Sequence, residues 1–232
     1  IKWISDMNIF KTALAVASPF LLGKGLEYAG TAGANYFVDM EAAKKYGVTI
    51  MNCPGYNADA VAEMAIGLGI MVARKVPGQQ HELRGGLWHG ENSHGFLISG
   101  KTIGIIGNGN VGKRIQELLS GWSNNFLVAD SKTSSSDLDA IFKHSQIIFV
   151  CCPLNDHTRG MVNENRLESM QDNSIIINVA RGAVISQSSL KNCLRSGRLY
   201  GAGLDVFENE PEYGADVSSE IREFYEMSNV FV

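Results

Sequence analysis

The chain has 232 residues, of which 45% are hydrophobic and 19% are charged, a balance typical of globular proteins and not of disordered ones. Its formal net charge is −4, and its lysines and arginines are scattered, which excludes the basic surface that a nucleic-acid partner requires. The length is sufficient for one large domain or two small ones, each with a buried core.

The cysteines and the apolar runs argue against a metal site, a redox pair or a membrane segment. The four cysteines show neither a zinc-ligand spacing nor a C-x-x-C pair: they are Cys53, Cys151, Cys152 and Cys193. We expect them to be small apolar residues in a reducing cytoplasm, with no metal bound. The apolar runs 12–23 and 64–73 are too short to span a bilayer, and the second, bounded by charges, predicts a buried helix.

The first part of the chain predicts a small α/β unit followed by a long helix. Residues 25–55 show the pattern of a strand, a glycine-rich turn, a helix and a second strand. Residues 57–76 predict one long helix, with Asn57 or Asp59 near its N-cap, that bridges two units. We therefore assign residues 1–56 to part of a substrate-binding domain and residues 57–98 to a bridging helix and linker.

From residue 101 onward, short apolar runs alternate with segments of helical periodicity. The predicted strands are 102–107, 126–130, 146–152, 174–179, 199–207 and the start of one more at 229–232, and the predicted helices are 111–120, 137–145, 163–170 and 186–197. Strands that are apolar throughout and alternate with helices form a parallel sheet that is covered on both faces. Residues 99–232 therefore predict a doubly wound α/β domain of the Rossmann type.

The segment GNGNVG, Gly107 to Gly112, is a G-x-G-x-x-G turn between a predicted strand and a predicted helix. In such a turn Gly107 permits the tight bend, Gly109 lets a pyrophosphate approach the backbone, and Gly112 lets helix and strand pack closely. The amides of Asn110 and Val111 then face the phosphates at the positive end of the helix dipole. The placement predicts a dinucleotide-binding site.

Asp130 selects between the two nicotinamide dinucleotides. It ends the next predicted strand, where a carboxylate accepts hydrogen bonds from the hydroxyls of the adenosine ribose. The same carboxylate repels a 2′-phosphate, so NAD is favoured over NADP. Lys132 lies close by in the sequence and keeps NADP possible.

Two later strand ends carry residues suited to chemistry. Arg181 follows a core strand at the edge where such sheets bind ligands, and a guanidinium there can hold a carboxylate with two hydrogen bonds. The stretch GLDVFENEPE, from Gly203 to Glu212, places Asp205 and Glu210 after another strand. From the residues alone, a surface arginine and a solvated acidic loop are the favoured interpretations.

Three segments in this order resemble a known family: GNGNVG, NVARG (178–182) and GAGLDVFENEP (201–211). They are similar to the glycine turn, the Asn-x-x-Arg-Gly segment and the Gly-x-x-x-Asp-Val-x-x-x-Glu-Pro segment of the D-isomer-specific 2-hydroxyacid dehydrogenases. The likeness extends from about Gly25 to Val232. It implies a Rossmann cofactor domain with a second, smaller flavodoxin-like α/β substrate domain, which is incomplete in these residues.

The resemblance implies roles at the substrate. Arg181 would hold the carboxylate and the carbonyl oxygen, and Glu210 would hydrogen-bond a catalytic histidine. Backbone amides around Ala32 and Gly33 would receive the substrate carboxylate, although AGANYFVD departs from the family's wording there. The family places its histidine directly after the strand that here reads NVFV, so it is expected beyond Val232. The five histidines present do not occupy that position: His81, His89, His94, His144 and His157.

The resemblance also implies roles at the cofactor. Asp205 would contact the nicotinamide carboxamide, and Val179 and Ala180 would line the nicotinamide ring. Pro153 and Thr158 would lie beside the adenosine and phosphate half.

The function implied is that of a cytoplasmic, homodimeric oxidoreductase that transfers a hydride between NAD(H) and a small D-2-hydroxy acid or 2-oxo acid. Some relatives with the same fold are non-catalytic NAD(H)-responsive binding proteins, such as transcriptional corepressors. The residues leave this alternative open, because the cofactor motif would be identical.

Overall fold

The computed structural model describes residues 40–48, 55–88, 90, 94–211 and 215–232. It divides the chain into two units, residues 1–54 and 55–232. In the first unit, the helix α3 (Met40–Lys45) falls within the segment predicted as a small α/β unit, most of which lies outside the described residues. The domain boundaries predicted at residues 56 and 98 stay a prediction.

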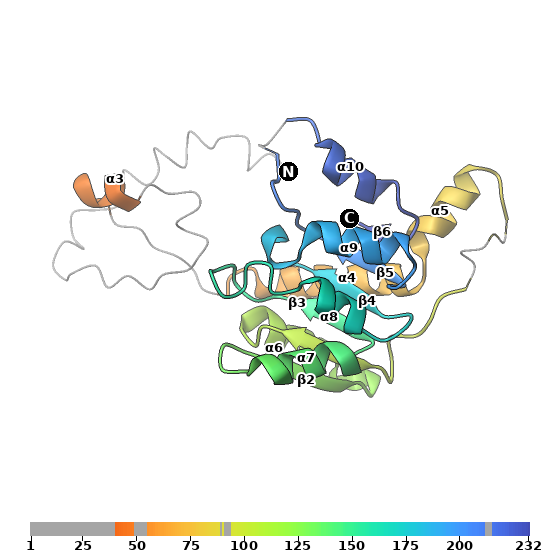
Figure 1. Ribbon diagram of the computed structural model, residues 1–232, viewed down its shortest axis with the longest axis horizontal. Coiled ribbons are helices and arrows are strands. Elements are labelled where there is room, and N and C mark those ends of the chain that lie inside the picture. Colours follow the sequence, from red (N-terminus) through yellow and green to blue (C-terminus); the bar gives the residue numbers. More distant parts are fainter. Residues whose placement is uncertain (1–39, 49–54, 89, 91–93, 212–214) are drawn as a thin grey trace. The chain divides into compact units, whose positions relative to one another are not determined.

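The second unit is built on a six-stranded sheet in which every neighbouring pair of strands is parallel (Figure 1). The strand order is β2-β1-β3-β4-β5-β6, and the strands are β1 (Thr102–Ile106), β2 (Asn125–Ala129), β3 (Ile147–Val150), β4 (Ile175–Asn178), β5 (Gly201–Leu204) and β6 (Val230–Phe231). The α-helices are α4 (Ala58–Ala73), α5 (Val76–Arg84), α6 (Asn110–Leu119), α7 (Ser135–His144), α8 (Glu164–Ser169), α9 (Gln187–Arg195) and α10 (Ser219–Tyr225). Short 3₁₀ turns occupy η4 (Ser120–Trp122) and η5 (Gly182–Val184).

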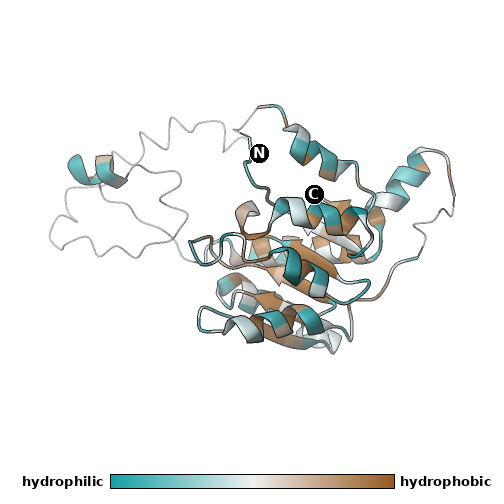
Figure 2. Ribbon diagram, viewed as in Figure 1, coloured by the Kyte–Doolittle hydropathy of each residue, from teal (hydrophilic) through white to brown (hydrophobic). Residues whose placement is uncertain are grey.

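Helices cover both faces of this sheet because successive side chains of a strand point to opposite sides. On β3, Ile148 and Val150 enter the core shared with α7, α8, α9 and α10, whereas Ile147 and Phe149 enter the core shared with α4 and α6. All four β3 residues are fully buried. In Figure 2 the strands are coloured hydrophobic, whereas α5 and α10 are largely hydrophilic. The predicted doubly wound fold is confirmed.

The helix predicted over residues 57–76 is α4, which ends three residues before the predicted end, and a second helix, α5, begins at Val76. α4 ends at Ala73, Lys75 takes a left-handed conformation with φ of 54°, and Pro77 lies in the first turn of α5. Proline removes a backbone donor and clashes with the preceding turn, so it is tolerated at a helix start and not in an interior. The apolar face of α4 packs on β4, β5 and α6 within the second unit.

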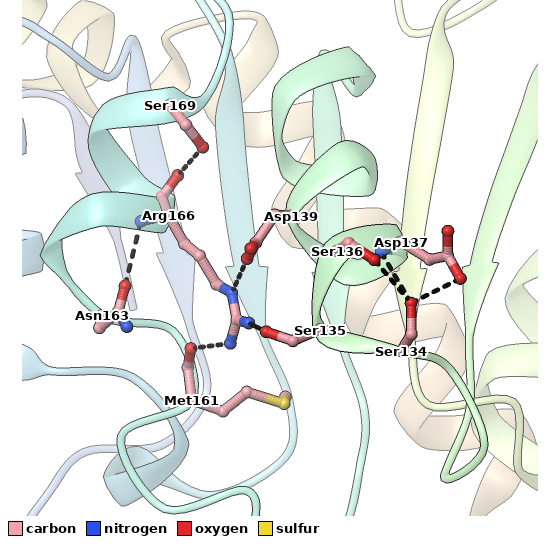
Figure 3. Close-up of polar contacts among 9 residues, drawn as sticks. All are labelled: Ser134, Ser135, Ser136, Asp137, Asp139, Met161, Asn163, Arg166 and Ser169. Carbon is pink, nitrogen blue, oxygen red and sulfur yellow. Dashed lines mark hydrogen bonds and ion pairs between the residues drawn. The ribbon is translucent and has the colours of Figure 1, made fainter.

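Arg166 joins the helices α7 and α8 on one side of the sheet (Figure 3). Its guanidinium donates to Asp139 Oδ1 at 2.7 Å, to the Met161 carbonyl oxygen at 2.7 Å and to Ser135 Oγ at 3.1 Å. The side chain is only 13% exposed, so these bonds compensate for its removal from water. These bonds hold α7 and α8 together on one face of the sheet.

Candidate active site

The strand order predicts a ligand site at the carboxyl ends of β1 and β3. The chain runs from β1 outward to β2 and then returns to β3 on the other side of β1. The connections that leave β1 and β3 therefore diverge, and ligands bind in the crevice at such a reversal point. The GNGNVG turn follows β1 at this edge, and α6 begins inside it.

Each of the three glycines in the turn has a distinct spatial reason. Gly107 has φ of 113°, and a Cβ there would lie 2.6 Å from the backbone nitrogen of Cys152. A Cβ on Gly112 would collide with the carbonyl oxygen of Gly107, so helix and strand pack too closely for a side chain. A Cβ on Gly109 would meet nothing within 4 Å. Packing requires glycine at positions 107 and 112. Gly109 instead keeps open the space that a bound pyrophosphate would fill.

Asn110 and Val111 are the first two residues of α6, and Gly109 is its N-cap without a side-chain cap. The first amides of a helix have no partner in the helix and carry partial positive charge, which suits phosphate oxygens. The Asn110 side chain packs against Gly55, where a Cβ would lie 2.9 Å from its amide nitrogen. These residues and the space at Gly109 fit a dinucleotide.

Cys151 donates a hydrogen bond to the Gly107–Gly112 turn. It was not predicted as a site residue. Its thiol donates a hydrogen bond to the Gly107 carbonyl oxygen at 3.2 Å. Burial raises the pKa of Cys151 to about 12 and that of Cys152 to about 11, so both remain protonated thiols at neutral pH. Cys151 is therefore a donor to the turn and not a reactive thiolate.

Asp130 follows β2 and lies at the same edge as the glycine turn. The Gly107 amide donates to the Ala129 carbonyl oxygen at 2.9 Å, which ties the turn to the end of β2. The Asp130 side chain is exposed, and its Oδ1 accepts the Lys132 amide at 2.8 Å. Asp130 is thus an exposed carboxylate at the sheet edge of the glycine turn, and its contact with the ribose stays a prediction.

Pro153 and Thr158 belong to a stiff loop after β3. The Thr158 hydroxyl donates to the Pro153 carbonyl oxygen at 2.7 Å and accepts the Asn155 amide at 2.8 Å. Asn155 Oδ1 accepts the amides of His157 and Thr158 at 2.9 and 3.1 Å. The hydroxyl of Thr158 is thus used inside the loop, where it holds residues 153–158 together.

Arg181 lies in the bend that follows β4, and the buried side chain of Asn178 stabilises this bend. Asn178 ends β4 with 1% exposure, accepts the Ala180 amide at 3.1 Å and donates to the Arg181 carbonyl oxygen at 3.2 Å. Val179 and Ala180 are buried, whereas Arg181 is exposed at the sheet edge. Asn178 was not predicted as a site residue; the available signal was its place at the end of a core strand, as the first residue of the Asn-x-x-Arg-Gly segment.

Asp205 follows β5 and lies next to this corner, because its amide donates to the Asn178 carbonyl oxygen at 3.0 Å. Loss of surrounding water and then the negative charge of Glu210 raise the pKa of the Asp205 carboxyl above its ordinary value. The two carboxylates that the sequence places five residues apart therefore interact in space.

The turn that carries Glu210 is held against the segment that carries Arg181. Glu210 Oε1 accepts the Phe207 amide at 2.9 Å, and Gln187 Oε1 at the start of α9 accepts the Glu208 amide at 2.9 Å. A Cβ on Gly182 would overlap the Phe207 and Glu208 backbone. The segments NVARG and GLDVFENEP thus meet in direct contact.

Some of the predicted substrate-site residues and one of the histidines lie outside the part of the chain that the structure describes. Ala32, Gly33 and His89 lie outside the described residues. No hydrogen bond or ion pair among the described residues joins a histidine to Arg181, Asp205 or Glu210. Within the same residues, no group of three or more His, Cys, Asp or Glu could hold a metal ion, and no helix is long and apolar enough to cross a membrane.

Comparison with known proteins assigns the family. Residues 66–232 match the model of the "D-isomer specific 2-hydroxyacid dehydrogenase, NAD binding domain". The chain belongs to the D-isomer-specific 2-hydroxyacid dehydrogenase family. The predicted family and NAD as its cofactor are confirmed, and the prediction of an NAD-dependent dehydrogenase is confirmed at the level of the family.

The relatives of this dehydrogenase-family chain include enzymes with several names. It is 34% identical to a hydroxypyruvate reductase of Thermotoga maritima over 215 residues, 89% of this chain and 70% of that protein. It is 35% identical to the glyoxylate/hydroxypyruvate reductase HPR3 of Arabidopsis thaliana over 75% of this chain and 57% of that protein. A D-lactate dehydrogenase with NAD⁺ from Lactobacillus jensenii matches with a TM-score of 0.75 and 27% identity, over 90% of this chain and 66% of that one. The chain thus spans less than two thirds of the last two proteins.

Proposed function

We propose that the protein interconverts a small 2-oxo acid and its D-2-hydroxy acid with NAD(H), the oxo acid taking up one hydride and one proton. The observation that carries this proposal is the direct packing of the Arg181 segment against the turn with Glu210, at the edge where the glycine turn lies. A non-catalytic relative with the same fold would keep this packing, so turnover of 2-oxo acids is the property that separates the two functions.

In this proposal the cofactor is held by Gly109, by the amides of Asn110 and Val111, and by the Asp130 carboxylate. Pro153 and Thr158 border its adenosine half, Val179 and Ala180 line the nicotinamide ring, and Asp205 accepts from its carboxamide. NAD(H) supplies or accepts the hydride when bound. The other tasks, which are orientation and proton transfer, fall to side chains of the protein.

Arg181 orients the substrate in this proposal. Its guanidinium donates to the substrate carboxylate and to the oxygen on C2, where it stabilises the negative charge that develops as the carbonyl is reduced. The amides around Ala32 and Gly33 bind the same carboxylate. The alkoxide oxygen then requires one proton to give the hydroxy acid.

The proton donor in this proposal is a histidine supported by Glu210. Imidazole titrates near neutral pH, and a neighbouring carboxylate stabilises its protonated form. β6 lies parallel to β5, so a residue after β6 would emerge at the same sheet edge as Asp205. This is the edge at which the family resemblance places the histidine.

We also propose a homodimer in the cytoplasm. The exposed side chains of Leu83, Leu87 and Trp88, at and after the end of α5, support association with a second copy. Three free cysteines among the described residues support a reducing compartment.

Arg181→Ala tests the proposed reaction. Oxidation of NADH is followed by absorbance with hydroxypyruvate, glyoxylate and pyruvate as substrates, and NADH affinity is followed by fluorescence. We expect Arg181→Ala to lower kcat/KM about a hundredfold or more, because substrate orientation and charge stabilisation are lost. The affinity for NADH should stay within about twofold. Arg222→Ala, at an exposed position of α10, is the matched control and should behave as the parent protein.

Two results would contradict this proposal. Parent protein that binds NADH but reduces none of the 2-oxo acids would favour an NAD(H)-responsive binding protein. An equal loss of NADH affinity and of turnover in Arg181→Ala would make Arg181 a structural residue of the cofactor site.

A further inference from the structure

The residues after β2 form a closed hydrogen-bonded turn around Asp130. The Asp130 amide donates to Thr133 Oγ1 at 2.9 Å, and the Thr133 amide donates to the Asp130 carbonyl oxygen at 3.2 Å. The Thr133 hydroxyl in turn donates to Asp130 Oδ1 at 3.4 Å, and the Lys132 amide donates to the same oxygen at 2.8 Å. One threonine hydroxyl thus contacts both the backbone and the carboxylate of Asp130.

This turn restrains a side chain that would otherwise be mobile. Asp130 is exposed, and an exposed aspartate without partners samples several rotamers at little cost. Thr133 is half-buried and β-branched, so its own side chain has few conformations. Its hydroxyl is therefore a fixed point against which the Asp130 carboxylate is oriented.

The positive charge of Lys132 lies close to Asp130 in the sequence. The orientation of the Asp130 carboxylate therefore affects whether a ribose or a phosphorylated ribose is favoured. Lys132 is exposed two residues away, and an ammonium group is a suitable partner for a phosphate. A carboxylate held at the ribose position repels a 2′-phosphate and accepts ribose hydroxyls. A carboxylate that swings away would leave Lys132 as the dominant charge for a phosphorylated ribose.

We infer that Thr133 is a positioning residue for cofactor choice: its hydroxyl holds Asp130 in the orientation that favours NAD(H) over NADP(H). This inference rests on the proposed NAD(H) site and adds a residue that the family motifs do not include. Thr133 need not touch the cofactor, since it acts through Asp130.

The test is the ratio of NADH to NADPH affinity, measured by fluorescence titration of the purified protein. Thr133→Val keeps the shape of the side chain and removes the hydroxyl, and should lower this ratio about fivefold, the effect of losing about one hydrogen bond. Thr133→Ser restores the hydroxyl and should return the ratio to within about twofold of the parent value. If Thr133→Val does not fold, Thr133→Ala takes its place in the same comparison.

Ser134→Ala is the matched control in the same loop. Ser134 Oγ accepts the Asp137 amide at 3.1 Å and caps α7, as Figure 3 shows. Its loss should lower the melting temperature without changing the NADH to NADPH ratio. A change in the ratio of equal size in Ser134→Ala would attribute the effect to loop stability and overturn the inference.

A double-mutant cycle with Asp130→Ala shows whether Thr133 acts through Asp130. In the Asp130→Ala background, Thr133→Val should have no further effect on the ratio. Independent, additive effects would overturn the inference, as would an unchanged ratio in Thr133→Val alone. A parent protein that binds neither NADH nor NADPH would instead contradict the proposed function itself.

Discussion

Gly182 is the residue at which the Arg181 segment and the Glu210 turn touch. A Cβ at this position would overlap the backbone of Phe207 and Glu208, and backbone cannot move aside as the end of a side chain can. We expect Gly182→Ala to displace the turn and to lower kcat for 2-oxo acid reduction about a hundredfold. Steady-state kinetics would measure the loss, and NADH affinity should stay within about twofold of the parent value, since Gly182 lies outside the glycine turn.

Gly121→Ala is the control for that substitution. Gly121 lies in η4 with nothing within 4 Å of the position of a Cβ, so alanine should change the free energy of unfolding by less than about 0.5 kcal/mol. If Gly182→Ala retains the parent kcat, the contact between the two segments does not position the reacting groups.

Site residues that belong to a sequence motif could be predicted from the sequence. Residues that only support a site residue through a hydrogen bond could not. Gly107, Gly112 and Asp130 stand at fixed offsets from a strand end, and the structure places them at one edge of the sheet. Cys151 and Thr133 have no such signature, because each becomes relevant only through a hydrogen bond that the three-dimensional turn creates.

An ion-pair cluster joins α10 to α9, and an aromatic contact joins it to Phe207. Glu223 accepts from Lys191 Nζ at 3.1 Å and Arg195 Nη2 at 2.7 Å, both on α9. The Phe224 ring lies 5.7 Å from that of Phe207, between ring centroids, which links α10 to the Glu210 turn. The position of α10 therefore bears on the candidate active site.

We expect the attachment of α10 to weaken in acid. The hydrogen bond from Lys191 and then that from Arg195 lower the pKa of Glu223 below its ordinary 4.5. A lowered pKa in the folded state contributes stability that is present above pH 4.5 and is lost as the pH falls through the lower folded value. Amide hydrogen exchange of residues 219–225 should therefore accelerate below pH 4.5, relative to that of β3.

Glu223→Gln should produce the same faster exchange at pH 7, and high salt should reduce the difference between variant and parent, because the pair is exposed. Glu226→Gln is the control, since Glu226 forms no ion pair within the described part of the chain. If the amide exchange rate of α10 changed neither with pH nor with Glu223→Gln, aromatic packing alone would hold the helix in place.

Helices with strong periodicity next to strands were predictable, whereas two of the shorter polar helices, α5 and α10, were not. α6 and α9 lie within two residues of their predicted bounds, because an apolar stripe marks the face that packs on the sheet. α5 and α10 lack such a stripe; α10 buries only Ile221 and Phe224. Their helical state depends on a proline start, a serine cap and contacts with distant residues.

At the scale of the whole molecule, the parallel sheet places every candidate residue of the second unit at one edge. The glycine turn, Asp130, Arg181 and Asp205 follow four different strands, and a parallel sheet brings the carboxyl ends of all four to the same side. Alternation of strands and helices predicted this arrangement. The segment of Ala32 and Gly33 lies outside the described residues, and the substrate class therefore remains a proposal.

The most direct test of the central claim, that the Gly107–Gly112 turn binds NAD(H), is the NADH affinity of Gly109→Ala measured beside its melting temperature. A Cβ there meets nothing in the protein, so the melting temperature should fall only slightly, through the exchange of a glycine N-cap for alanine, whereas the control Gly67→Ala, inside α4, should be slightly more stable because alanine favours a helix interior. NADH affinity should fall about tenfold or more, because the Cβ fills the space of the pyrophosphate. Gly109→Ala that binds NADH as tightly as the parent and Gly67→Ala proteins would contradict the account.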